Sequence, residues 1–80
     1  MVQTEVVWNL PTDPVTVDVV LAKAQELKDQ GKEAATPMAV VSGGKRYTAR
    51  WWIDEATAIQ WVDFCEPFGP YSAEVIFSQP

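Results

Sequence analysis

Two adjacent glycines, Gly43 and Gly44, lie between two runs of residues that favour β-strands. Glycine adopts the positive φ angles that a two-residue β-turn requires, so residues 42–45 predict a tight hairpin. Such a turn also sets the register of the two strands. The predicted cross-strand pairs are Val41 with Arg46, Val40 with Tyr47, Ala39 with Thr48, and Met38 with Ala49.

This register divides the hairpin side chains between two faces, because successive residues of a strand point to opposite sides. One set comprises Met38, Val40, Tyr47, Ala49, Trp51 and Ile53. The other comprises Ala39, Val41, Arg46, Thr48, Arg50 and Trp52. We expect the first set to form the core and the second set, with Trp52, to lie on a face that the helices leave open.

The chain before the hairpin predicts a strand followed by a helix. Residues 2–9 are rich in β-branched side chains, and prolines then end the strand. Asp13 before Pro14 is typical of a helix start, and Gly31 is typical of a helix end. The expected buried stripe of this helix contains Val17, Val20, Leu21, Ala24 and Leu27.

The chain after the hairpin repeats this order. Asp54 is a good N-cap for a helix that extends to about Glu66 and is stopped by Pro67. Apolar and polar residues alternate over 72–78 and predict a fourth strand. The order β-α-β-β-α-β favours an α+β, ferredoxin-like fold for residues 1–80 as a single domain, in which two helices cover one face of a four-stranded antiparallel sheet.

Composition narrows the function classes. The chain has 80 residues, a net charge of −5 and no histidine, which argues against attraction to nucleic acid or anionic lipid. No apolar run is long enough to cross a membrane, and one cysteine excludes an internal disulfide. We expect a cytoplasmic protein without membrane attachment. The basic charge is concentrated in the hairpin, where Lys45, Arg46 and Arg50 occur with no acidic residue between Glu33 and Asp54.

We expect no catalytic, metal or cofactor site. Without histidine, the commonest general base and nitrogen ligand are missing, and a catalytic triad is impossible. Cys65 lies on an apolar helix face, which favours a buried thiol over a reactive one. The glycines at 43–44 join two strands and lack the spacing of a phosphate-binding loop.

The open face is instead expected to be a protein interface, because aromatic and arginine side chains favour interface centres. The expected interface residues are Trp52, Arg50, Arg46, Val41, Val7 and Ile76. Glu5 and Glu74 could pair with the arginines across strands. The second helix is apolar over more than one stripe, so a second candidate interface contains Trp61, Phe64 and Phe68.

Residues 48–64, T-A-R-W-W-I-D-E-A-T-A-I-Q-W-V-D-F, resemble the strand-into-helix passage of monooxygenase-like members of the dimeric α+β barrel superfamily. The resemblance implies two ferredoxin-like subunits packed sheet against sheet. It also implies an alternative function, a cofactor-free or flavin-assisted oxygenase with Asn9, Trp52 and Arg50 lining a pocket. Haem-degrading members use a histidine, which this chain lacks.

Our leading prediction is a small non-enzymatic domain that forms a homodimer through its open sheet face, with a heterologous protein partner as the next possibility. RNA-recognition domains share the same element order. The strand at 45–52 lacks their aromatic pattern, which argues against nucleic acid as a partner, and an RNA-binding sheet is therefore the second alternative. A small acidic chain of this kind would fit an accessory or phage-encoded protein.

Overall fold

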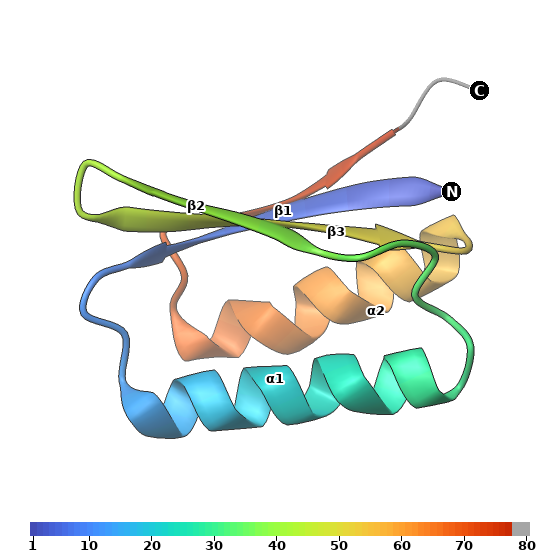
Figure 1. Cartoon of the computed structure of the whole chain (residues 1–80), viewed down its shortest axis with the longest axis horizontal. Helices are drawn as coiled ribbons and strands as arrows, with labels where there is room; N and C mark the ends of the chain where they lie inside the picture. Colours follow the sequence, from blue (N-terminus) through green and yellow to red (C-terminus); the bar gives the residue numbers. More distant parts are fainter. Residues whose placement is uncertain (78–80) are drawn as a thin grey trace.

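The computed structural model describes residues 1–77 and has two layers (Figure 1). One layer is an antiparallel sheet in the order β2-β3-β1-β4. The other contains two helices under the same face of that sheet. The elements are β1 (Val2–Asn9), α1 (Pro14–Asp29), β2 (Met38–Ser42), β3 (Lys45–Trp52), α2 (Glu55–Cys65), a 3-10 turn η1 (Glu66–Phe68) and β4 (Ser72–Ile76). The predicted ferredoxin-like α+β fold is confirmed.

Side-chain caps define where both helices begin. The Asp13 carboxylate accepts a hydrogen bond from the Val15 backbone N–H at 2.8 Å, and Pro14 occupies the first turn of α1. Asp54 accepts from the Thr57 backbone N–H at 2.8 Å and from the Thr57 hydroxyl at 2.7 Å. These bonds satisfy backbone donors that have no partner inside the helix.

The double glycine forms the predicted turn. Gly43 and Gly44 have φ angles of 59° and 73°, and all four predicted cross-strand pairs of β2 and β3 are present. The backbone N–H of Leu10 donates to the Gly44 carbonyl at 2.9 Å. The turn is therefore hydrogen-bonded to the segment that follows β1 as well as to its own strands. The fourth strand ends at Ile76, and Ser78, its predicted last residue, lies outside the described residues.

The core lies between the sheet and the helices. Its largest fully buried side chain is that of Trp52, which packs on Trp61 of α2 with ring centroids 5.4 Å apart. The buried cluster contains Val6, Trp8, Val20, Ala24, Leu27, Trp52, Ala58, Trp61 and Cys65. Three of the four tryptophans are in it, so most of the tryptophan side chains serve to fill the core.

The predicted assignment of the two sheet faces is wrong. Trp52 has no exposed surface, whereas Val40 of the expected core set is 57% exposed. Arg50 is buried, and its cross-strand partner on β1, Thr4, is buried too. The helices cover the side that carries Arg46, Thr48, Arg50 and Trp52, and Val41 shares that side because it pairs with Arg46.

The wrong assignment has a physical cause. Alternation places Trp51 and Trp52 on opposite faces, but it does not say which face the helices will cover. The two most buried polar groups of the covered set are paired with groups from distant parts of the chain. Arg50 forms an ion pair with Glu33, and Trp52 donates to the Thr4 hydroxyl. Such pairing removes most of the cost of burying polar groups, so a set that looks less apolar can form the core.

Candidate functional site

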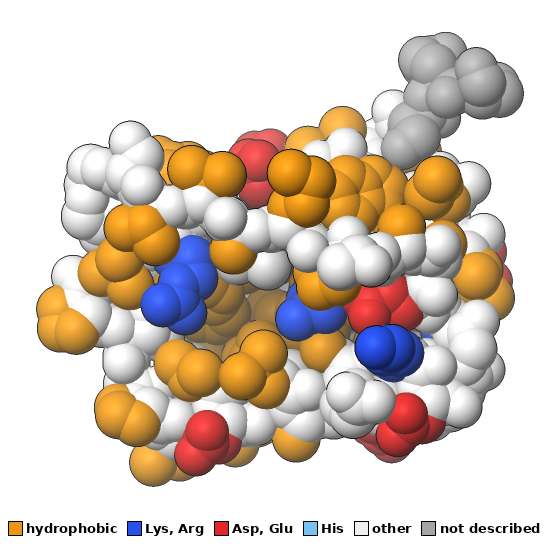
Figure 2. Space-filling model, in the orientation of Figure 1, with side chains coloured by type: hydrophobic (Ala, Val, Ile, Leu, Met, Phe, Trp, Pro, Cys, Tyr) orange, Lys and Arg blue, Asp and Glu red, His pale blue; other side chains and the backbone are white. Residues whose placement is uncertain are grey.

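The face of the sheet opposite the helices, called the open face below, carries several large apolar side chains. Met38, Val40, Tyr47 and Ile76 are between 36% and 62% exposed, and Trp51 is half-buried. Register places them on one side of the sheet, together with Gln3, Glu5, Val7, Ala49 and Glu74. In Figure 2, hydrophobic side chains gather along the upper margin, above the sheet. The open face is thus an apolar surface with a few charges.

On the open face, the negative charges and the positive charge lie at different positions along the strands. Glu5 and Glu74 are direct cross-strand partners, a like-charge arrangement that weakens a sheet unless another group compensates. Lys45 lies at the hairpin end of the same face, where its ammonium sits 4.5 Å from the centroid of the Tyr71 ring. The predicted pairing of these glutamates with Arg46 and Arg50 is wrong, because the arginines project from the other face.

The edge strand β2 adds a second unusual feature. None of its five residues is buried, and none is charged. Val40 points to the open face and Val41 to the helix side, yet their exposed fractions, 57% and 61%, are nearly equal. Edge strands of stable monomers are usually protected by charge, proline or a covering segment. β2 therefore extends the apolar surface around the edge of the sheet.

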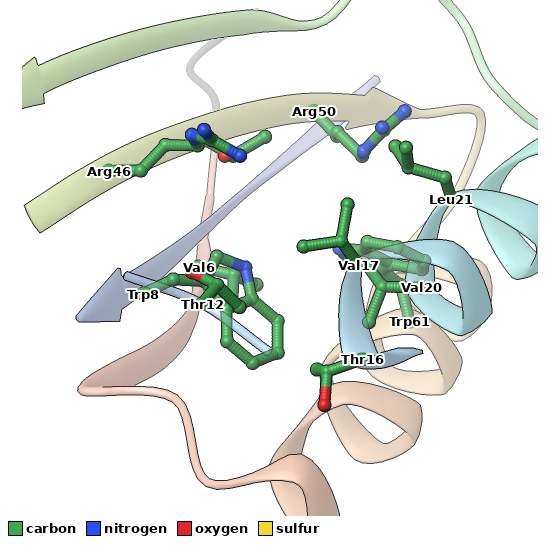
Figure 3. A pocket seen from close by; sticks show the side chains of 11 residues that line it. Val6, Trp8, Thr12, Thr16, Val17, Val20, Leu21, Arg46, Arg50 and Trp61 are labelled. Carbon is green, nitrogen blue, oxygen red and sulfur yellow. The ribbon is translucent and has the colours of Figure 1, made fainter. Parts of the chain in front are cut away.

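A cleft lies on the helix side, between α1 and β3. Figure 2 shows it as a hollow with hydrophobic side chains at its bottom and basic side chains at its rim. In Figure 3, Arg46 and Arg50 project from β3, with Arg50 next to Leu21 of α1 and Arg46 above Trp8. The lining residues are Val6, Trp8, Thr12, Thr16, Val17, Val20, Leu21, Arg46, Thr48, Arg50 and Trp61. The cleft thus combines an apolar floor with two arginines.

Arg50 is the most unusual residue of the cleft. Its Nη1 donates to Glu33 Oε2 at 2.8 Å, and the side chains of both residues are nearly fully buried. Its guanidinium carbon lies 5.3 Å from the centroid of the Trp61 ring, within cation–π range. Its Nε is buried and has no hydrogen-bond partner among residues 1–77. A buried donor without an acceptor is costly, so this atom marks a place where an acceptor would be stabilising.

The structure separates the six residues of the predicted interface into two groups. Val7 and Ile76 lie on the open face, although Val7 is only 2% exposed. Arg46 and Arg50 line the cleft, Val41 lies on their side of β2, and Trp52 is in the core. Tyr47 and Trp51, which the sequence predicts to be in the core, lie on the open face, with Tyr47 exposed and Trp51 half-buried. The hairpin register correctly predicted that these two side chains share a face, but the prediction exchanged the buried face and the open face.

The second predicted interface runs from the core to the surface. Trp61 is 2% exposed, Phe64 is half-buried and Phe68 is 38% exposed. Their rings form a continuous row, with centroid distances of 6.4 Å between Trp61 and Phe64 and 5.5 Å between Phe64 and Phe68. The apolar excess of α2 is thus used mainly to fill the core, and only the end of the row reaches the surface.

The three residues predicted to line an oxygenase pocket do not all lie on one side of the sheet. Arg50 and Trp52 are on the helix side of β3, where both contact Trp61. Asn9 is exposed at the end of β1, on the open face. The enclosed part of the cleft is about 60 Å³. Small-molecule sites usually measure roughly 300–1,000 Å³, so this space suits part of a ligand rather than a whole substrate of that size.

Cys65 is completely buried in the core. Burial raises the pKa of its thiol to about 12, and the nearby positive charge of Arg50 offsets only part of this effect. Among residues 1–77, no three acidic, cysteine or histidine side chains are grouped as a metal site would require. Neither described helix is both long and apolar enough to span a bilayer.

The fold and these two surfaces define a ferredoxin-like α+β domain with an uncovered apolar sheet face and an arginine-lined cleft. Comparisons of the chain with protein-family models, curated proteins and solved structures find no match. The function must therefore be inferred from these surfaces alone.

Proposed function

We propose that this chain is a small, non-enzymatic protein-binding domain that self-associates by packing the open face of one copy against that of another. The observation that carries the proposal is the exposure of large apolar side chains on the one sheet face that no helix covers. These side chains are Met38, Val40, Tyr47 and Ile76, and the half-buried Trp51 lies on the same face. Contiguous apolar patches of this kind mark interaction sites in soluble proteins, and aromatic residues are enriched at interface centres.

The charges of the open face favour a second copy of the chain as the partner. Glu5 and Lys45 lie on the same face, and Glu5 pairs with Ala49, four residues along β3 from Lys45. That distance is about 13 Å along a strand. A two-fold axis between the sheets and perpendicular to the strands would bring Lys45 of each copy towards the paired glutamates of the other. A self-complementary patch is what a two-fold symmetric interface requires.

RNA is a less suitable partner for the same face. Tyr47 and Trp51 are of a type that can stack on bases. However, Glu5 and Glu74 share the surface with them, and the whole chain carries a net charge of −5. A phosphate backbone would be repelled by this surface.

Sedimentation velocity over a concentration series tests the proposal. The wild-type chain is expected to shift from monomer to dimer as concentration rises. Trp51→Glu and Val40→Glu place a charge in the proposed interface and should keep the chain monomeric. Val41→Glu is the matched control, because Val41 is adjacent to Val40 on β2, equally exposed and directed to the other face.

Three outcomes would contradict the proposal. A wild-type chain that stays monomeric at hundreds of micromolar would exclude self-association. Dimers that survive Trp51→Glu would place the interface elsewhere. Equal loss of dimer in Val40→Glu and Val41→Glu would instead indicate pairing through the β2 edge, since both side chains flank that edge.

A further inference from the structure

We infer that the cleft between α1 and β3 is a binding site for a small monoanionic carboxylate that carries a short apolar body. This site lies on the opposite side of the sheet from the open face, and the inference does not depend on self-association. Three features of the cleft carry it: the arrangement of its donors, its net charge and its apolar floor.

The donors come from one side of β3. Arg46, Thr48 and Arg50 alternate along the strand, so all three point to the helix side and line the cleft. The two arginines are about 13 Å apart at their Cα atoms. Arg50 is held in place by Glu33 and Trp61, so Arg46 is the side chain that would move towards a shared ligand. Guanidinium groups bind carboxylates through two parallel hydrogen bonds. In Figure 3 both arginines face the space in front of α1.

Arg50 provides the specific indication that an acceptor is missing. Only 8% of this residue is exposed, and its Nε has no hydrogen-bond partner among the described residues. Its position is held by Glu33 through Nη1 and by the ring of Trp61. Arg50 is thus a fixed donor in a partly enclosed space, which is the kind of group that orients a ligand. A carboxylate oxygen in the cleft would satisfy it.

The charge of the cleft selects a monoanion. Arg46 and Arg50 are the charged residues of its lining, and Glu33 neutralises one of them. One net positive charge remains. A dianion such as phosphate would leave an excess negative charge in a space that is largely apolar, where uncompensated charge is expensive. The acidic surface of the rest of the chain disfavours polyanions further.

The apolar floor of the cleft is the reason that the proposed ligand carries an apolar body. Val6 and Trp8 from β1, Val20 from α1 and Trp61 from α2 form it, and all four are buried core residues. The enclosed volume of about 60 Å³ limits what can be fully buried to a few heavy atoms. Leu21 at the edge of the cleft is 52% exposed and can cover the outer part of a ligand. A short aliphatic or a single-ring carboxylate meets these conditions.

The indole N–H signals of the tryptophans in a ¹H–¹⁵N spectrum give a direct test, with benzoate as the probe. Trp8 and Trp61 line the cleft, whereas Trp51 lies on the other side of the sheet. Addition of benzoate is expected to shift the Trp8 and Trp61 signals in a saturable way and to leave Trp51 unchanged. Benzamide, which has the same ring without the charge, should bind at least tenfold more weakly, roughly the effect of losing one charged hydrogen bond. Inorganic phosphate in its dianionic form should also bind at least tenfold more weakly, because its second charge would be uncompensated in the cleft.

A pair of neighbouring variants separates specific binding from general charge attraction. Arg46→Gln removes the partly exposed arginine of the cleft and should weaken benzoate binding by roughly tenfold or more. Lys45→Gln makes the same change in charge one residue earlier, on the open face, and should leave benzoate binding unchanged. Both positions are only partly buried, so both variants are expected to fold.

Several results would overturn the inference. They are the absence of saturable shifts at Trp8 and Trp61, equal weakening by Arg46→Gln and Lys45→Gln, phosphate binding as tight as that of benzoate, or benzamide binding as tight as that of benzoate. In the first case a trapped water would be sufficient to satisfy Arg50. In the last two the cleft would be a general anion site or a general apolar site.

Discussion

Trp52 donates its indole N–H to the hydroxyl of Thr4 across 2.9 Å, inside the core and between residues 48 positions apart in the chain. Both residues are completely buried, and the Thr4 hydroxyl also lies 3.5 Å from the Arg50 carbonyl oxygen. Buried indole N–H groups usually need such an acceptor. This bond gives the buried indole N–H an acceptor where Trp52 faces the helices.

Replacing Thr4 by valine should destabilise the fold by about 1–3 kcal/mol, because Val keeps the shape of Thr but leaves the Trp52 donor unpaired. Urea unfolding followed by tryptophan fluorescence measures the change. Thr4→Ser keeps the hydroxyl and removes one methyl group, and should cost only about 1 kcal/mol. A valine variant as stable as the serine variant would show that the bond contributes little.

Breaking the Arg50–Glu33 ion pair should be strongly destabilising. Glu33→Gln leaves the Arg50 charge buried without its counterion, at an expected cost of about 3 kcal/mol. Glu26→Gln is the matched control, since Glu26 pairs with Lys23 on the exposed side of α1 and such pairs contribute less than about 1 kcal/mol. Equal effects of the two substitutions in urea unfolding would contradict this prediction.

The cap of α2 should make stability depend on acid pH. Hydrogen bonds from the backbone and then the hydroxyl of Thr57 lower the pKa of Asp54 in the folded chain. Its contribution is therefore complete above the unfolded-state pKa of about 4 and is lost as pH falls through the lower folded-state value. Thermal unfolding of Asp54→Asn, compared with wild type, should show a difference that shrinks as the wild-type carboxylate is protonated. A difference that is constant down to the lowest pH would contradict this.

Cys65 should be unreactive in the native chain. Its thiol is buried, and burial raises its pKa to about 12, so hardly any thiolate exists at neutral or mildly alkaline pH. An aromatic disulfide reagent at mildly alkaline pH should label the native chain far more slowly than the urea-unfolded chain. Rapid labelling without denaturant would show that the core opens easily around α2.

The elements of the fold could be predicted because each has a local cause. Proline at position 14 and aspartates at 13 and 54 define helix starts, and the double glycine sets the hairpin register. The candidate sites were harder to predict from the sequence. The cleft depends on how α1 sits over β3, and the pairing of Arg50 joins a loop residue to a strand residue 17 positions later.

By itself, the sequence determined the order of the elements, their boundaries to within a few residues, and the alternation that separates Trp51 from Trp52. Only the tertiary structure decided which of these tryptophans is buried. Alternation gives two faces but no preference between them when both carry apolar and aromatic groups. The choice depended on distant partners, Thr4 for the Trp52 indole and Glu33 for the Arg50 guanidinium, which make the less apolar face the one that can be covered.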